Sequence, residues 1–386
     1  MYSFDDVIDR RNTHSLKWDD TERVFGAKDV LPLWVADMDF PAPQAVIKAL
    51  HERIAHGIFG YTVIPNSLKD AIKNWLKLRH QWEIEPSWLS FSTGVVPEIA
   101  NAIEAFTEQN DRIVVFTPVY PPLFQLVKKH QRTLVTSPLR LAENRYEIDW
   151  EDFEKKIQGA KLLLLCSPHN PGGRVWTYEE LTKIGELCIK HNVIVVSDEI
   201  HADLTFLPHR HVPFASIDPA FAENSVTCIA PTKTFNLAGL QAAAAIIPNE
   251  TLKRQFNKVQ QRQGFFTLNT FAVAGTEAAY RHGQEWLDAL LRYLQENIDY
   301  LCSYIEANLP KLRVIRPEAT YLVWIDCRQL DVTEQQLRQL LLEKGKIAVE
   351  FGSKFGEEGR GFIRMNVACP RKTLEDALFR LSVALQ

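Results

Sequence analysis

The sequence predicts an α/β protein with a mainly parallel central sheet covered by helices, followed by a smaller α+β region. Two observations support this fold class. The middle of the chain alternates short apolar runs with helix-like segments, and the runs are apolar on both faces, as strands of a covered parallel sheet are. The predicted strands are residues 112–118, 161–168, 192–199, 225–231 and 240–248.

A helix is predicted between the second and third of these strands, over residues 177–191. Thr177 and Glu180 have the spacing of a capping box, which satisfies free N–H groups at a helix start. An apolar stripe at helical spacing follows, formed by Leu181, Ile184, Leu187 and Cys188. Such a helix supplies the crossover that two parallel strands require.

The pattern changes after about residue 283, where a second and smaller α+β domain is expected. The segments that predict it are a long helix at 285–309, a strand within 316–328, a helix at 333–345 that opens with a Thr333–Gln336 capping box, and an apolar run at 361–370. We therefore expect a large domain over 48–282 and a small domain built from 1–47 and 283–386.

Composition narrows the possible classes of function. The 386 residues carry a formal net charge of −4, which gives no reason to expect nucleic acid or a membrane surface as partner. The longest apolar run, 237–248, is far short of the ~20 residues of a membrane span. The N-terminus has no apolar stretch typical of a signal peptide, and the six cysteines form no CxxC pair. We expect a soluble, cytoplasmic protein with reduced thiols.

Polar residues follow three of the predicted strands directly. Asn170 comes after the second, Asp198 and His201 after the third, and Lys233 after the fourth. In an open parallel sheet, ligands bind beyond the carboxyl ends of the strands, so these side chains are expected to converge. Taken singly, each has a commoner structural role, such as a turn, a helix cap or a surface lysine. Their joint occurrence favours a site.

A possible anion site lies upstream, at Thr93 and Gly94. The glycine precedes a helix in which Pro97 suits the first position, and the N–H groups at a helix start attract anions. An anion site, a carboxylate, an amide and a lysine are together what pyridoxal phosphate (PLP) requires. The lysine forms a Schiff base with its aldehyde, and the carboxylate keeps its pyridine nitrogen protonated.

Motifs along nearly the whole chain resemble those of the MalY/PatB-type cystathionine β-lyases. These C–S lyases are fold-type I PLP enzymes, related to the class I/II aminotransferases. The matching motifs are LWVADMDF (33–40), HGIFGYT (56–62), STGVVPEI (92–99), PVYPP (118–122), PHNPGGRVW (168–176), VVSDEIHADL (195–204), APTKTFNLAGLQ (230–241), TYLVWID (320–326) and FIRMN (362–366). The resemblance implies the aspartate aminotransferase-like fold, PLP as cofactor, an amino acid as substrate and a homodimer with shared active sites.

The resemblance also implies roles for individual residues. Lys233 would bind the cofactor and move the Cα proton of the substrate. The other cofactor-binding residues would be Asp198 at the pyridine nitrogen, Asn170 at the ring oxygen, Tyr120 stacked on the ring, His201 beside it, and Val95, Val96 and Thr232 at the phosphate. Tyr61 would reach the phosphate from the partner subunit and count among the catalytic residues. Arg364 would bind the substrate carboxylate, with Ala36 and Trp34 in the site-entrance segment.

Three positions depart from the aminotransferase pattern and favour a lyase. His201 replaces the usual tyrosine, Gln241 an arginine that binds phosphate, and Ala230 a serine. We therefore expect α,β-elimination on cystathionine or another S-substituted cysteine, giving a thiol, pyruvate and ammonia. An aminotransferase acting on an α-amino acid remains an alternative, because it needs the same lysine, aspartate and arginine. A binding or regulatory protein on the same scaffold is an alternative from another class.

Two other enzyme classes are not favoured by the sequence. A nicotinamide enzyme would carry a GxGxxG motif after a strand, and none follows any predicted strand. The histidines and cysteines lack the spacing of zinc ligands, so no metal site is expected. Thr234, which follows Lys233, has no role that the sequence indicates.

Overall fold

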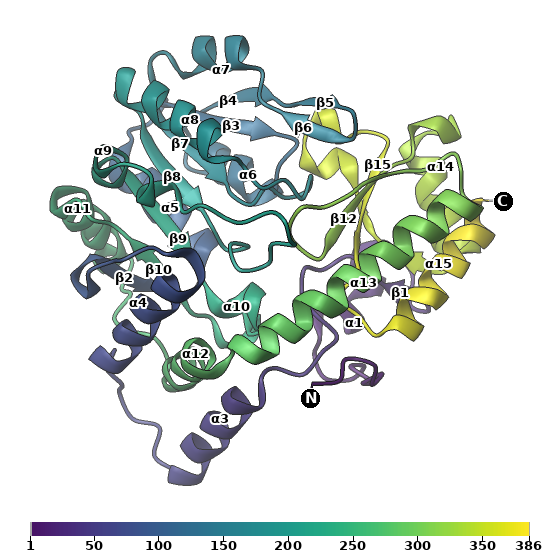
Figure 1. Cartoon of the computed structure of the whole chain (residues 1–386), viewed down its shortest axis with the longest axis horizontal. Helices are drawn as coiled ribbons and strands as arrows, with labels where there is room; N and C mark the ends of the chain where they lie inside the picture. Colours follow the sequence, from purple (N-terminus) through teal and green to yellow (C-terminus); the bar gives the residue numbers. More distant parts are fainter. Residues whose placement is uncertain (1, 386) are drawn as a thin grey trace.

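The fold is described from a computed structural model, which covers residues 2–385. A seven-stranded sheet forms the centre of the larger part of the molecule (Figure 1). Its strands, in spatial order, are β2 (Leu89–Ser92), β10 (Ala243–Ile246), β9 (Ser225–Ile229), β8 (Ile194–Asp198), β7 (Ala160–Cys166), β3 (Arg112–Thr117) and β4 (Thr133–Pro138). The pairs from β9 to β4 are parallel, which confirms a mainly parallel sheet. The predicted strand at 240–248 is present as β10, but it runs antiparallel to both neighbours.

Helices cover both faces of this sheet, and alternate residues of β3 show how. Ile113 and Val115 pack in one cluster with helices α5, α6 and α11, whereas Val114 and Phe116 pack in another with α7 and α8. The helices of this part are α3 (Gln44–His56), α4 (Asn66–His80), α5 (Val95–Phe106), α6 (Pro121–Lys129), α7 (Trp150–Ile157), α8 (Tyr178–Lys190), α9 (Pro219–Glu223), α10 (Pro231–Thr234), α11 (Glu250–Arg262) and α12 (Thr270–His282). A hairpin of β5 (Arg140–Ala142) and β6 (Arg145–Glu147) completes it.

Helix starts agree with the sequence in one case and differ in another. The capping box predicted for α8 is formed, with both Thr177 and Glu180 bonds present. Helix α5 begins at Val95, so Pro97 is its third residue and not its first as predicted. Gly94, in an extended conformation, is the N-cap, and the first N–H groups of α5 have no hydrogen-bond partner within the helix.

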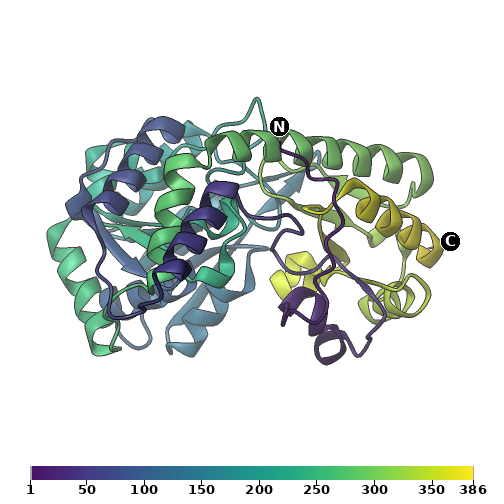
Figure 2. The same cartoon turned by 90° about the horizontal axis from the view of Figure 1, so that it is seen from below.

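A second, antiparallel sheet forms the core of the C-terminal part. Its order is β11 (Arg313–Ile315), β12 (Leu322–Asp326), β15 (Phe362–Asn366) and β14 (Glu350–Phe351). Helices α13 (Gln284–Asn308), α14 (Glu334–Gln339) and α15 (Arg371–Leu385) accompany it, and the Thr333–Gln336 capping box is formed. The N-terminal helices α1 (Leu16–Asp19) and α2 (Thr21–Phe25) lie against this part, and β1 (Leu31–Pro32) pairs in parallel with β13 (Ile347–Ala348), so the N-terminal segment packs against the C-terminal part of the chain (Figure 2).

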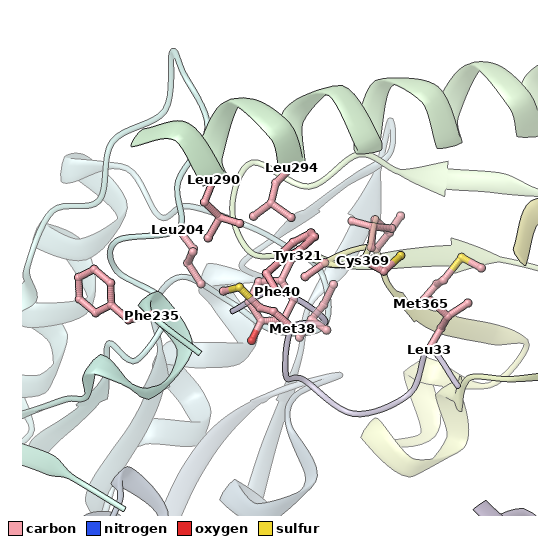
Figure 3. Packing of buried hydrophobic residues seen from close by; sticks show 14 of the residues in the cluster. Leu33, Met38, Phe40, Leu204, Phe235, Leu290, Leu294, Tyr321, Met365 and Cys369 are labelled. Atoms are coloured by element: carbon pink, nitrogen blue, oxygen red, sulfur yellow. The ribbon is translucent and has the colours of Figure 1, made fainter. Parts of the chain in front are cut away.

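One apolar cluster joins the two parts beneath helix α13. Leu290 and Leu294 point from this helix toward Tyr321, and Met38 and Phe40 of the N-terminal segment lie next to them (Figure 3). These side chains are almost fully buried. The N-terminal segment is therefore packed between the C-terminal sheet and the end of the large sheet where the polar residues gather.

Two further findings concern the described residues as a whole. Within residues 2–385, no helix is both long and apolar enough to cross a bilayer. All six cysteines are free thiols, and five of them are buried.

Candidate active site

The parallel strands bring the predicted polar residues to one edge of the large sheet. Strand β7 ends at Cys166, β8 at Asp198 and β9 at Ile229, and neighbouring strands end in register. The loops that follow carry Asn170 and Lys233. The charged groups at this edge lie close enough to influence one another: Asp198 and Arg364 both affect the pKa of Lys233.

Lys233 lies in the one-turn helix α10, which Pro231 starts. Its Nζ donates a hydrogen bond to the carbonyl of Ala36 at 2.6 Å. Burial lowers the pKa of Lys233 from 10.5 to about 8, Arg364 acts in the same direction, and Asp37 and Asp198 oppose it. An amine with this pKa is partly neutral near physiological pH, as a proton acceptor must be.

Asp198 is a buried carboxylate that has no cation bonded to it. Its Oδ1 accepts the N–H of Ile200 at 3.2 Å, and no salt bridge is found for it among residues 2–385. Burial raises its pKa to about 6. A buried acid with this pKa needs a cationic partner to remain charged, so it suits a protonated pyridine nitrogen.

His201 is a neutral imidazole next to these charges. Burial, with Lys233 and Arg364 nearby, lowers its pKa to about 3. Its Nδ1 is buried and has no hydrogen-bond partner among the described residues. The ring of Tyr321 lies 6.4 Å from its own, centroid to centroid. His201 can therefore offer a free ring nitrogen to a bound group.

Arg364, on β15, extends into the site from the C-terminal sheet. Its Nη1 donates to Asn170 Oδ1 at 3.1 Å, and its Nη2 donates to the Trp34 carbonyl at 3.0 Å. Its Nε is buried and has no partner in the described chain. The N–H of Tyr120 donates to the Asn170 carbonyl at 3.0 Å, which joins Tyr120 to the same group. The guanidinium is thus held in place with donor capacity left for a carboxylate.

The expected phosphate site lies at the start of α5. Gly94 has no side chain that could cap the helix, and Pro97 has no N–H. The backbone N–H groups of Val95 and Val96 are therefore the ones that a bound anion can use. Thr232 is half-buried in α10, with its hydroxyl forming no hydrogen bond among residues 2–385. These groups fit a phosphate.

Other predicted site residues lie differently from the central group. Tyr61 is fully exposed, and its ring lies 6.4 Å from that of the exposed Phe266, between centroids. The Trp34 ring packs edge-on against Phe25, so only its carbonyl reaches Arg364. Ala36 contributes its carbonyl to the site.

The partners of two residues within the motifs, Tyr321 and Asn236, could not be read from the sequence. The Tyr321 hydroxyl donates to the same Ala36 carbonyl, at 3.0 Å. Asn236 accepts the Met38 N–H and donates to the carbonyls of Met38 and Phe40, each at 2.9 Å, so it joins the lysine turn to the N-terminal segment. An asparagine in FNLAG reads as a turn residue, and nothing in the sequence indicates its partner.

Behind the site, an ionic cluster secures the N-terminal segment. Arg10 bonds Asp37 and Asp39 at 2.7–3.0 Å, and the fully buried Lys17 bonds Asp39 at 2.7 Å. The position of Asp37 beside Lys233 follows from this cluster. Nothing in the sequence indicates that Lys17, which stands in a polar N-terminal stretch, is buried.

Comparison with known proteins identifies the class to which this fold and site belong. Residues 28–381 match the family model "Aminotransferase class I and II". Because this covers most of the chain, the protein belongs to the class I and II aminotransferase family. The predicted aspartate aminotransferase-like fold is thereby confirmed.

Within this family the chain belongs to the PatB/MalY group, as its motifs predicted. It is 46% identical to the cystathionine β-lyase PatB of Bacillus subtilis, over 99% of this chain and 100% of that protein. It is 33% identical to the protein MalY of Escherichia coli, over 100% of this chain and 99% of MalY. The crystal structure of cystalysin from Treponema denticola, which contains a pyridoxal 5'-phosphate cofactor, is 35% identical and superimposes with a TM-score of 0.97 over 100% and 99% of the two chains.

Proposed function

We propose that this protein is a PLP-dependent C–S β-lyase that acts on cystathionine and related S-substituted cysteines. One observation carries the proposal: an amine of lowered pKa, Lys233, lies at the edge of the sheet together with a buried acid of raised pKa, Asp198, and a held guanidinium, Arg364. Full-length similarity to a cystathionine β-lyase supports the same activity.

The residues present fit the cofactor that cystalysin contains. Asp198 would hold the pyridine nitrogen, Asn170 the ring oxygen and Tyr120 the ring face, with His201 beside it. The phosphate would lie on the N–H groups of Val95 and Val96 and the hydroxyl of Thr232. Lys233 would bind the aldehyde carbon. When bound, PLP supplies an electron sink for the pair left on the substrate Cα.

The chain's own groups then divide the work on the substrate. Arg364 binds the α-carboxylate, using the Nε and the donor capacity that its two internal bonds leave free. Lys233, once free and neutral, takes the proton from Cα. The Cβ–S bond then breaks, and the sulfur leaves with the electron pair as a thiolate. The remaining 2-aminoacrylate takes up water and gives pyruvate and ammonia.

Product analysis tests this reaction type. The purified enzyme is incubated with cystathionine in the absence of any 2-oxo acid. A lyase releases homocysteine and pyruvate under these conditions. A strict requirement for a 2-oxo acid, with no thiol released, would refute the proposal.

Aminotransfer is the second candidate function. The observation that favours it is the match to the family model "Aminotransferase class I and II". It shares every step up to loss of the Cα proton. Gln241, His201 and Ala230 depart from the aminotransferase pattern, which is why the lyase is preferred. A purely binding or regulatory role is less well supported, because Lys233, Asp198 and their neighbours are all present.

We further propose a homodimer in which Tyr61 completes the site of the other subunit. Tyr61 belongs to an exposed apolar surface that a second copy of the chain would cover, made up of Ile54, Ile58, Phe59, Tyr61, Val63 and Phe266. Mixing inactive Tyr61→Phe and Lys233→Ala subunits should restore activity, because a mixed dimer has one complete site. If the mixed subunits show no activity, either directly or after they have been unfolded and refolded together, the shared site is contradicted.

The expected domain division and cellular location also remain proposals. A large domain over 48–282 and a small domain of 1–47 with 283–386 are supported by the two separate sheets. A cytoplasmic location is supported by six free thiols, which are rare in oxidising compartments. Limited proteolysis and cell fractionation are the respective tests.

A further inference from the structure

Thr234 follows Lys233, and its side chain is directed away from solvent into a polar cluster. It is 1% exposed, and its Oγ1 donates to Asp203 Oδ2 at 2.8 Å. The Asp203 carboxylate also accepts His80 Nε2 at 2.8 Å and Trp75 Nε1 at 3.0 and 3.2 Å. Asp203 thus has three side-chain donors, two of them from helix α4.

Aromatic packing also supports the turn that carries Lys233 and Thr234. The Trp75 ring lies 5.3 Å from the ring of Phe235, the residue after Thr234, and 5.7 Å from that of Tyr280 on α12, between centroids. Phe235 and Leu204, the neighbour of Asp203, both belong to the buried apolar cluster (Figure 3). Helix α4 therefore contacts the lysine turn through both a hydrogen-bond network and an aromatic one.

The lysine turn needs such support because it is short. Helix α10 has four residues, and its closing backbone bonds are Phe235 N–H to Pro231 at 2.9 Å and Leu237 N–H to Thr232 at 3.0 Å. A single helical turn is unstable by itself. Fixing the Lys233 side chain therefore depends on contacts made by its neighbours.

We propose that Asp203 is a positioning residue, which acts through Thr234 to fix the turn that directs the Lys233 amine. The inference rests on the proposed role of Lys233. Asp203 is the fitting acceptor because it is charged: its pKa is lowered in spite of burial, since His80 and Thr234 donate to it. Hydrogen bonds to an ionised acceptor are stronger than neutral ones.

The proposal predicts a specific change in Lys233 when the Thr234 hydroxyl is removed. In Thr234→Val the turn loses its bond to Asp203, so water gains access to the amine and the pKa of Lys233 rises toward its ordinary value. The titratable and charged groups facing the amine, Asp37, Asp198, His201 and Arg364, are unchanged by this substitution. Loss of orientation should lower kcat about 10-fold or more.

The test compares Thr234→Val with Thr234→Ser, which keeps the hydroxyl. The amine is titrated in the full-length protein freed of cofactor, by pH-dependent labelling of Lys233 and mass spectrometry. Thr234→Val should titrate about one pH unit higher than wild type, and Thr234→Ser close to wild type. Ser382→Ala is the matched control, since Ser382 is a buried hydroxyl on α15 that bonds Tyr304 at 3.0 Å. It should lower the melting temperature without moving the Lys233 titration.

A second variant keeps the proposal testable should Thr234→Val not fold. His80 and Asp203 line a surface groove with a volume of about 1400 Å³, which gives imidazole a path to the space left by His80→Ala. That variant should lose kcat, and added imidazole should restore part of it. An unmoved Lys233 titration in Thr234→Val, or equal behaviour of the Val and Ser variants, would overturn the proposal. Because the titration uses no substrate, it is independent of whether the lyase reaction itself is observed.

Discussion

Replacing Asp198 by asparagine should stabilise the cofactor-free protein while abolishing its activity. The carboxyl is 5% exposed, and burial raises its pKa from 3.8 to about 6. Above that pH the folded protein contains a buried charge with no cation bonded to it. Asparagine has nearly the same shape and carries no charge, so it removes this cost together with the carboxylate proposed to pair with the pyridine nitrogen.

The size of the effect follows from proton linkage. Between about pH 4 and pH 6 the folded state holds a proton that the unfolded state has already lost, so the free energy of unfolding falls as the pH rises through this window. The two pKa values differ by roughly two pH units, and each unit corresponds to about 1.4 kcal/mol, which gives about 3 kcal/mol at pH 8. Below about pH 4 both states are protonated and the cost disappears.

Urea unfolding of the two full-length proteins without cofactor measures this directly. Asp198→Asn should exceed wild type by about 3 kcal/mol at pH 8, and the gain should largely vanish near pH 4. Asp39→Asn is the matched control: Asp39 is equally buried, but Lys17, Trp18 and Arg10 bond it and its pKa is lowered. That substitution should destabilise at pH 8. An Asp198→Asn variant that is less stable than wild type at pH 8, or a gain that is the same at both pH values, would refute the reasoning.

Three further predictions concern substrate binding, the pH profile and the fold. Arg364→Lys removes a forked donor and should raise KM for cystathionine about 10-fold or more, measured by steady-state kinetics. Asp37→Asn removes a carboxylate that raises the pKa of Lys233, so the acidic limb of the kcat profile, which reports the amine freed in the substrate complex, should move to lower pH. Gly173→Ala should destabilise the protein by about 1–3 kcal/mol in urea unfolding, since a Cβ at its φ of +65° would lie 2.6 Å from Pro317.

Features set by local sequence were predictable. All five residues of β9 (Ser225–Ile229) are buried because helices cover the sheet, and they lie within the predicted strand 225–231. Both capping boxes are bonds between residues three apart, and both are present. The order of polar residues after parallel strands was enough to group Asn170, Asp198 and Lys233, because parallel strands end at one edge.

Features set by contacts between distant parts of the chain could not be predicted from the sequence. Strand β10 is as apolar as the parallel strands of the sheet, yet it pairs antiparallel with both β9 and β2, and β2 lies far away in sequence. The acceptor for the Lys233 amine is the Ala36 backbone carbonyl, which no side-chain motif indicates. Thr234 meets Asp203 across 31 residues, and neither residue type identifies the other.

The central claim is tested most directly by the ratio of thiol to pyruvate released from cystathionine by wild type and by Lys233→Ala, with no 2-oxo acid present. A β-lyase that uses this site should release the two products in equal amounts, and Lys233→Ala should release neither. Thiol release by Lys233→Ala at the wild-type rate, or pyruvate formation without thiol, would contradict the account.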